Sequence, residues 1–264
     1  MRLLKRLFGG ATPNRAPEPF SAPLAPDAAL AVVGDIHGCA RLLDDLLAQI
    51  EARVPERIVF VGDFIDRGEA SAEVLARLFA LSRAAGTRAV FLKGNHEEMM
   101  LRFLDDPEEH AARWLRYGGL QTLASYGIGG LGAAPDAARA LKARDALARA
   151  IGPDVLSWLR NLPTRFQSGN VAVVHAGANP EKPIEAQSET ALIWGHPAFR
   201  KTTRRDGIWV VHGHTIVDAV APEAGRIGVD TGAYATGRLS AALIDRDRLE
   251  VVTARYAPPP RETS

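Results

Sequence analysis

The sequence contains a single cysteine, Cys39, among its 264 residues. One cysteine excludes a disulfide within the chain and a zinc site built from several thiolates. Neither sign of charge dominates, because 32 Lys and Arg accompany 31 Asp and Glu, so nothing in the net charge favours nucleic acid as a partner. No run of about 18 apolar residues occurs, and we therefore expect no transmembrane helix. The scarcity of cysteine suits a reducing compartment, and we expect a cytoplasmic protein.

The two ends of the chain differ in composition from its middle. Residues 1–10 form the basic segment MRLLKRLFGG, in which Lys5 and Arg6 interrupt the apolar run that a signal peptide needs. This segment could make weak contact with a membrane surface, but we favour a frayed basic terminus. Five prolines lie in residues 11–27. We predict that residues 1–27 and 258–264 are disordered and that one domain occupies residues 28–257.

Strand and helix patterns alternate from residue 30 onward. Apolar runs at 30–33, 58–61 and 89–92 are each followed by apolar residues at helical spacing, which predicts parallel βαβ units. Residues 105–162 contain helical patterns only, so we predict a helical insertion there. Strand-like segments then recur at 171–174, 209–211, 226–229, 239–244 and 249–253. The pattern predicts an α/β sandwich whose second half is richer in strands.

Five short motifs follow the apolar runs: GDIHG at 34–38, GDFIDRG at 62–68, GNHE at 94–97, HAG at 175–177 and HGHT at 212–215. They place five of the seven histidines beside Asp and Asn at expected strand ends, where open α/β sheets bind ligands. Asp35 and His37 are two residues apart, a spacing that directs both side chains to one side of extended backbone. Imidazoles mixed with carboxylate and amide oxygens predict a first-row metal site better than they predict a folding core.

The ordered set of motifs resembles the phosphoprotein phosphatase branch of the calcineurin-like metallophosphoesterases. Within that branch the chain is most similar to the compact bacterial and bacteriophage serine/threonine phosphatases. The segments GGLQTLASYG at 118–127, LIW at 192–194 and VDTGAY at 229–234 are also similar to that bacterial group. The resemblance covers about residues 30–245 and implies two mixed β-sheets flanked by helices.

This resemblance implies a centre of two metal ions that share Asp63. The residues expected to bind the first ion are Asp35, His37 and Asp63, and those expected to bind the second are Asp63, Asn95, His175 and His214. Two divalent cations with two carboxylates leave about two positive charges to attract a phosphate dianion. Three imidazoles with carboxylate and amide oxygens suit manganese, iron or zinc better than magnesium or calcium. The resemblance to the bacterial group implies manganese, with iron or zinc as alternatives.

The resemblance also implies the reaction. A hydroxide that bridges the two ions would attack phosphorus directly, without a covalent phosphoenzyme. His96 would protonate the leaving oxygen as general acid, and Asp66 would orient His96. Arg67, whose planar fork suits phosphate oxygens, would bind the substrate together with Asn95.

One position departs from the family pattern. The bacterial relatives carry a phosphate-binding arginine two residues after the tryptophan of LIW, where this chain has His196. His196 itself, Arg200, Arg204 or Arg205 could replace that arginine; alternatively, the loop is an ordinary surface loop. We take Arg200 as the working hypothesis.

These assignments predict a dimetal phosphomonoesterase, specifically a monomeric serine/threonine protein phosphatase acting on phosphorylated protein. A symmetrical dinucleoside tetraphosphatase is the nearest enzyme alternative, and a non-catalytic phosphate-binding module is the alternative from a different class. The aromatic residues that could stack on a base in the expected substrate regions are few, which argues mildly against a nucleotide: Trp114, Tyr117, Tyr126, Trp194 and Phe199.

Overall fold

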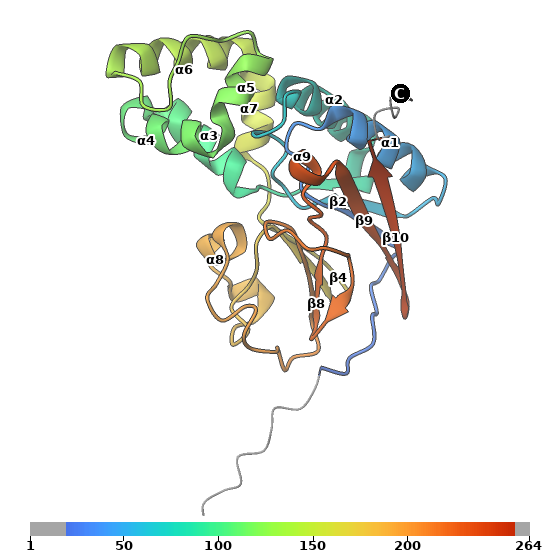
Figure 1. The fold of residues 1–264 in the computed structure, drawn as a ribbon. Helices are drawn as coiled ribbons and strands as arrows, with labels where there is room; N and C mark the ends of the chain where they lie inside the picture. Colours follow the sequence, from blue (N-terminus) through green and yellow to red (C-terminus); the bar gives the residue numbers. More distant parts are fainter. Residues whose placement is uncertain (1–19, 257–264) are drawn as a thin grey trace, which may run out of the picture.

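Two five-stranded mixed sheets form the centre of the molecule (Figure 1). The computed structural model describes residues 20–256. Sheet A has the strand order β10-β9-β1-β2-β3, and its strands are β1 (Leu30–Val33), β2 (Arg57–Phe60), β3 (Ala89–Phe91), β9 (Arg238–Asp245) and β10 (Arg248–Arg255). Sheet B has the order β4-β5-β6-β8-β7, and its strands are β4 (Arg165–Ser168), β5 (Val171–Val174), β6 (Trp209–His212), β7 (Pro222–Glu223) and β8 (Arg226–Gly228).

Both sheets contain parallel and antiparallel pairs, and in sheet A β9 lies antiparallel to both β1 and β10. In sheet A, β1 pairs in parallel with β2, and β2 with β3. In sheet B, β5, β6 and β8 are parallel, with β4 and β7 antiparallel at the edges. The predicted sandwich of two mixed sheets is confirmed, and so are the parallel βαβ units. The edge strands β4 and β7 were not predicted.

The core between the sheets takes every second residue of the central strands. In β1, Leu30 and Val32 belong to the apolar cluster between the sheets, while Ala31 and Val33 belong to the cluster beneath the helices. β5 alternates in the same way between the inner cluster and one on the outer face of sheet B. Strands buried on both faces need apolar residues at every position, which explains the continuous apolar runs of the sequence.

Helices cover the outer face of sheet A and continue beyond it at one end (Figure 1). α1 (Ala40–Glu51) and α2 (Ser71–Ala84) connect the parallel strands. The helices that follow β3 are α3 (Asn95–Asp105), α4 (Pro107–Trp114), a π-helical turn (Leu115–Gly119), α5 (Leu120–Ser125), α6 (Ala137–Ile151) and α7 (Pro153–Arg160). Their buried faces join those of α1 and α2 in one apolar cluster. Two short helices, α8 (Glu189–Trp194) and α9 (Ala233–Thr236), belong to the later half.

Residues 20–27 differ from the predicted unpacked lead-in. The Phe20 ring packs edge-on against Trp209, with centroids 4.8 Å apart, and Leu24 is buried. Trp209 Nε1 donates to the Ala22 carbonyl at 2.9 Å, and the Ala25 amide donates to Asn170 Oδ1 at 2.8 Å. The packed part of the chain therefore begins before residue 28. The remainder of the two ends predicted to be disordered, 1–19 and 258–264, lies outside the described residues.

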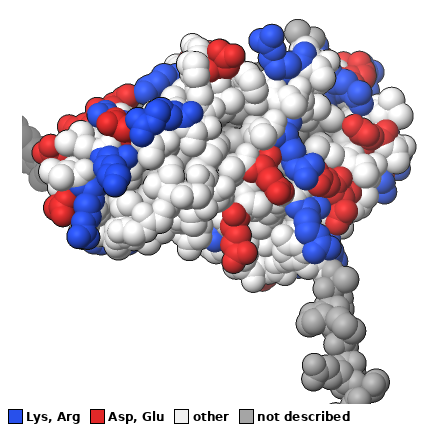
Figure 2. Space-filling model, turned by 90° about the horizontal axis from the view of Figure 1, so that it is seen from above, with Lys and Arg blue, Asp and Glu red and all other residues white. Residues whose placement is uncertain are grey.

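The surface seen from above in Figure 2 carries both signs of charge. Lys and Arg lie beside Asp and Glu at two ends of this face, and a broad uncharged area separates them. Within residues 20–256, no helix combines the length and apolar character needed to cross a membrane.

Candidate active site

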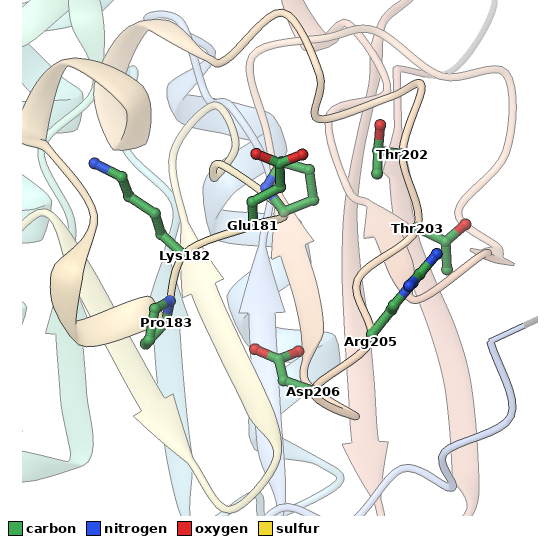
Figure 3. Close-up of a pocket in the computed structure, with 8 residues that line it drawn as sticks. Glu181, Lys182, Pro183, Thr202, Thr203, Arg205 and Asp206 are labelled. Atoms are coloured by element: carbon green, nitrogen blue, oxygen red, sulfur yellow. The ribbon is translucent and has the colours of Figure 1, made fainter. Parts of the chain in front are cut away.

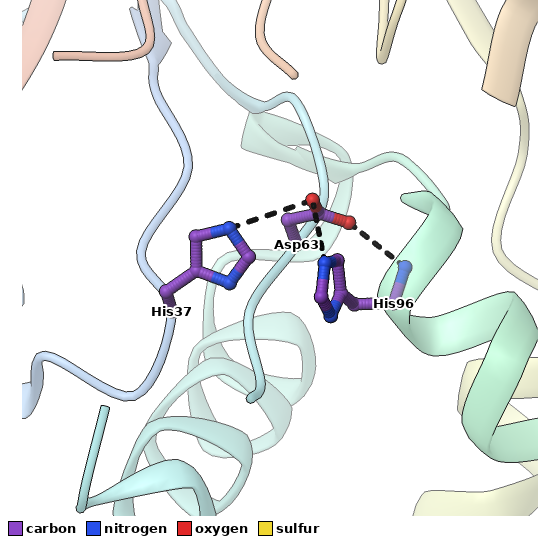
Figure 4. A group of neighbouring side chains, drawn as sticks. All are labelled: His37, Asp63 and His96. Carbon is purple, nitrogen blue, oxygen red and sulfur yellow. Dashed lines mark hydrogen bonds and ion pairs between the residues drawn. The ribbon is translucent and has the colours of Figure 1, made fainter. Parts of the chain in front are cut away.

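Asp63 lies at the centre of the polar residues that follow the strands. Its Oδ2 lies 3.6 Å from His37 Nε2 and 3.9 Å from His96 Nε2, and these three side chains point toward one another in Figure 4. Its Oδ1 lies 3.4 Å from His175 Nε2. Two groups of donor atoms, each within 4.8 Å of one another, share this aspartate: His37, Asp63 and His96 form the first, and Asp63, His175 and His214 the second. This sharing is the geometry that a bridging carboxylate between two cations requires.

The tautomers of His37 and His175 leave the lone pair of each Nε2 on the side of Asp63. His37 Nδ1 lies 2.9 Å from the Ile65 carbonyl, and His175 Nδ1 lies 3.0 Å from the Val61 carbonyl, so each Nδ1 carries the proton and each Nε2 is an acceptor. Burial lowers the pKa of His37 to about 3 and that of His175 to about 4, so both rings are neutral at neutral pH. Neutral imidazoles held by a second hydrogen bond are the usual form of metal-binding histidine.

Oxygen acceptors crowd the same space. Asn95 Oδ1 lies 2.9 Å from His175 Nε2 and 2.7 Å from His214 Nδ1. Asp35 Oδ2 accepts the His214 amide at 2.9 Å, whereas Asp35 Oδ1 is buried and has no hydrogen-bond partner among the described residues. An unpaired buried carboxylate oxygen is costly unless a cation neutralises it. The donor set therefore fits divalent cations.

Electrostatics lead to the same conclusion. Burial, followed by the charges of Asp230 and Asp63, raises the pKa of Asp35 well above its ordinary value. Burial also raises the pKa of Asp230, to about 6. Closely spaced buried carboxylates repel one another, and bound cations would reverse this penalty. Gly213 supports the arrangement, because a Cβ at this position would overlap Asp35 Oδ1.

His96, a member of the first donor group, forms a buried pair with Asp66. His96 Nδ1 lies 2.6 Å from Asp66 Oδ2, and both side chains are almost completely buried. Burial lowers the pKa of His96, but the carboxylates of Asp63 and Asp66 outweigh it and raise the pKa overall. A protonated His96 would keep Nε2–H on the Asp63 side. The arrangement suits the predicted proton donor and its orienting carboxylate.

The helices between β3 and β4 hold the Asp66 carboxylate. Thr122 Oγ1 donates to Asp66 Oδ1 at 2.6 Å, and Trp114 Nε1 donates to Asp66 Oδ2 at 3.0 Å. The Arg67 amide donates to the Gly118 carbonyl at 3.4 Å. These roles of Thr122 and Trp114 were not predicted from the sequence. Their positions in and near GGLQTLASYG were the available signal, but no periodicity relates them to Asp66.

Glu97 is a third residue whose role was not predicted, although the GNHE motif contains it. It is fully buried, and its carboxylate accepts three backbone amides: Asp63 and Gly94 at Oε2, 2.8 and 2.9 Å away, and Phe64 at Oε1, 2.8 Å away. Burial, helped by the charge of Asp63, raises the pKa of Glu97 to about 7. Glu97 thus ties the loop that carries Asp63 to the start of α3.

Five site residues have a left-handed backbone. The φ angles are 45° at His37, 53° at Asp63, 71° at Asp66, 68° at Arg67 and 64° at His214. Only three other non-glycine residues in the described chain have positive φ. Such conformations cost about 1–3 kcal/mol each and concentrate at functional sites, which supports the assignment of this region.

Arg67 extends from the same loop toward α9. Its Nη1 donates to the Tyr234 hydroxyl at 3.1 Å, and its guanidinium lies 4.8 Å from the centroid of the Tyr234 ring. The same Nη1 lies 3.5 Å from His37 Nε2. Arg67 is therefore held next to the first donor group, where it can reach a bound anion.

His196, Arg204 and Arg200, the candidates for the second phosphate contact, differ from one another in burial and in hydrogen bonding. His196 Nδ1 accepts the Ala198 amide at 3.3 Å, which closes a local turn. Arg204 is buried, donates to the carbonyls of Asn179 and Lys182 and pairs with Asp206, so it is not available to a substrate. Arg200 is exposed. Its phosphate-binding role, like that of His196, stays a prediction.

The region 180–206 does contain a hollow, of about 590 Å³. Figure 3 shows the residues that line it: Glu181, Lys182 and Pro183 from one segment, and Thr202, Thr203, Arg205 and Asp206 from another. Neither His196 nor Arg200 lines it. Two of the aromatic residues considered for base stacking are also unsuitable, because Trp114 and Phe199 are only 0% and 4% exposed.

The sandwich and the two donor groups that share Asp63 define the class of protein, an α/β protein with a candidate two-metal centre at its strand ends. The chain belongs to the calcineurin-like phosphoesterase family, whose sequence model matches residues 28–218.

Its relatives are named for two activities. The chain is 33% identical over 150 residues to a symmetrical bis(5'-nucleosyl)-tetraphosphatase of Janthinobacterium sp. (strain Marseille), which covers 56% of this chain and 43% of the relative. It is 25% identical over 244 residues to the asymmetrical bis(5'-nucleosyl)-tetraphosphatase PrpE of Oceanobacillus iheyensis, covering 80% and 86%. A serine/threonine phosphatase structure from Saccharomyces cerevisiae is 18% identical with a TM-score of 0.56, covering 92% of this chain and 86% of that one, and this likeness shows the fold alone. The chain spans less than half of the length of the first relative.

Proposed function

We propose that the chain hydrolyses phosphoric esters and anhydrides, with a dinucleoside tetraphosphate as the first candidate substrate. The observation that carries the proposal is the position of Asp63 between two donor groups, beside the buried His96–Asp66 pair. The names of two relatives support the nucleotide substrate, and they favour this alternative over the protein phosphatase predicted from the sequence.

In this proposal two divalent cations are held by Asp35, His37, Asp63, Asn95, His175 and His214, with Asp63 shared. The ions, manganese by preference, would neutralise phosphate and lower the pKa of a nearby water. Arg67, held by Tyr234, grips phosphate oxygens at the edge of the site. Water adds to one central phosphorus and loses a proton to solvent, the P–O bond from that phosphorus to the other half of the substrate breaks, and the departing nucleoside diphosphate keeps the bonding electrons.

Phosphoserine or phosphothreonine in protein is the second candidate substrate, because a specific observation favours it. An alkoxide is a poor leaving group that needs a proton, whereas a nucleoside diphosphate leaves as a stable anion. The buried carboxylate 2.6 Å from His96 Nδ1 is an arrangement for delivering that proton from Nε2. The His96–Asp66 pair therefore matters most for a phosphomonoester.

The test is an assay of purified protein with diadenosine tetraphosphate, a phosphoserine peptide and p-nitrophenyl phosphate, each with manganese, iron, zinc or chelator. The proposal expects manganese-dependent hydrolysis, and the products distinguish symmetrical cleavage (two ADP) from asymmetrical cleavage (ATP and AMP). Phosphate binding without turnover of any substrate under any metal would overturn it and favour a non-catalytic phosphate-binding module.

The same assay tests the second phosphate contact. If Arg200 binds phosphate, Arg200→Ala raises KM for the substrate that is turned over, whereas His196→Ala leaves KM unchanged. Unchanged kinetics for Arg200→Ala would refute the Arg200 hypothesis.

A further inference from the structure

A hollow of about 210 Å³ lies between α3, α4 and α8. One of its walls is Met99, which follows His96 by three residues on α3 and so occupies the same side of that helix one turn further on. Another wall is Trp114, whose Nε1 donates to Asp66. Helix α3 and the Trp114 side chain therefore connect the hollow to the proposed proton donor and to the carboxylate that orients it.

Two parts of the chain meet across this hollow. Arg113 comes from α4, and Trp194 comes from α8, the short helix of the later half (Figure 1). The Arg113 guanidinium lies 4.7 Å from the centroid of the Trp194 ring. The contact makes one edge of the hollow both flat and cationic.

The charge of the lining favours an anion. Arg102, which pairs with Glu98 at 2.9 Å, and His110 also line the hollow, and Glu109 is its one carboxylate. Within residues 20–256, no carboxylate lies within ion-pair distance of Arg113, which is exposed. The Arg113 fork is thus available for phosphate oxygens.

We propose that this hollow receives the base of the departing nucleoside diphosphate, which packs against the Arg113–Trp194 stack, with the Arg113 fork directed to the phosphate nearest the base. The inference rests on the proposed function and adds a residue-level basis for substrate choice. The hollow is smaller than the roughly 300–1,000 Å³ of sites for drug-sized ligands, so it suits a single base rather than a peptide segment. Indole faces accept any base, because every base has a π-face.

The test compares two inhibitors of manganese-activated p-nitrophenyl phosphate hydrolysis, ADP and inorganic phosphate. This substrate has no second half, so the comparison does not depend on turnover of a dinucleotide. For the wild type, we expect ADP to inhibit at a concentration about tenfold or more below that of phosphate. Trp194→Ala and Arg113→Ala should each reduce this ADP preference by about 5- to 100-fold, the range for loss of one stacked base or one phosphate contact.

Arg116→Ala is the matched control, because Arg116 is an exposed arginine three residues along that does not line the hollow. Trp194→Phe keeps a ring and should retain most of the ADP preference. The inference is wrong if ADP inhibits the wild type no better than phosphate, or if Arg116→Ala loses as much ADP preference as Arg113→Ala.

Failure of the proposed function gives a different result. A protein that hydrolyses p-nitrophenyl phosphate but not diadenosine tetraphosphate would refute the substrate, while the inhibitor comparison would still decide the role of the hollow. If no substrate is turned over, calorimetric titration of the manganese-loaded protein with ADP and with phosphate gives the same comparison across the same variants.

Discussion

Asp66→Asn is the substitution that tests the proton donor most closely. The Asp66 side chain is 0% exposed, and its carboxylate accepts from His96, Thr122 and Trp114 at 2.6, 2.6 and 3.0 Å. Asparagine has nearly the same size but no negative charge. The change therefore removes the charge that favours protonated His96 and leaves the packing almost unaltered.

The expected loss in rate follows from the position of the Asp66 carboxylate beside His96. Opposite charges about 4 Å apart in a protein of effective dielectric constant about 20 attract by about 4 kcal/mol. Loss of that attraction lowers the pKa of His96, so the protonated form disappears at a lower pH. Most of the contribution of a general acid, about 10²- to 10⁴-fold in rate, is then lost at neutral pH.

The assay compares leaving groups under saturating manganese. Asp66→Asn should reduce kcat about 10²- to 10⁴-fold for a phosphoserine peptide, which leaves as an alkoxide. It should reduce kcat less than about tenfold for p-nitrophenyl phosphate or a dinucleoside tetraphosphate, whose leaving groups need no proton. The alkaline limb of the pH profile for the peptide should move to lower pH. Thr122→Val keeps the carboxylate charge and should have an intermediate effect. An equal loss for all leaving groups, with metal content unchanged, would refute the assignment of His96 as general acid.

Three further outcomes are expected. Gly118→Ala should lower the free energy of unfolding by about 1–3 kcal/mol and raise KM, because φ is 116° and the new Cβ would lie 2.6 Å from the Arg67 amide nitrogen. Gly127→Ala is the control, because Gly127 also has a positive φ but lies in open space, and it should lower the free energy of unfolding less. Urea unfolding measures the stability of both variants, and steady-state kinetics measures their KM. Cys39, only 5% exposed, should react with a thiol reagent only as fast as the protein unfolds, and rapid labelling of the folded protein would contradict its burial. Manganese should raise Tm and chelator should reverse the rise, because a cation relieves the unpaired Asp35 Oδ1; an unchanged Tm would argue against binding.

Much of the fold followed from local patterns. β1 spans Leu30–Val33 as predicted, and β5 spans Val171–Val174 as predicted, because buried parallel strands are continuous apolar runs. The edge strand β4 (Arg165–Ser168) was not predicted because three of its four residues are polar and its one apolar residue, Phe166, is only partly buried. The packing of residues 20–27 escaped detection because a proline-rich pattern carries no information about a distant partner such as Trp209.

In the candidate site, too, some residues were predictable from the sequence and others were not. The donor residues were recognisable because each follows a strand within a short motif. The supports of Asp66 were not recognisable, because Trp114 and Thr122 lie 48 and 56 residues away and reach it only through the packing of helices. Glu97 was within a motif, but its three backbone contacts depend on how two loops approach each other.

The sharing of Asp63 by two ions is the central claim, and metal counting tests it most directly. Manganese bound per chain is measured by elemental analysis after gel filtration for the wild type, Asp35→Ala and Asp63→Asn, with circular dichroism confirming that each variant is folded. We expect two ions in the wild type, one in Asp35→Ala, and weakened binding of both in Asp63→Asn, whose hydrolytic activity should be abolished. Retention of one tightly bound ion, or of wild-type activity, by Asp63→Asn would contradict this claim.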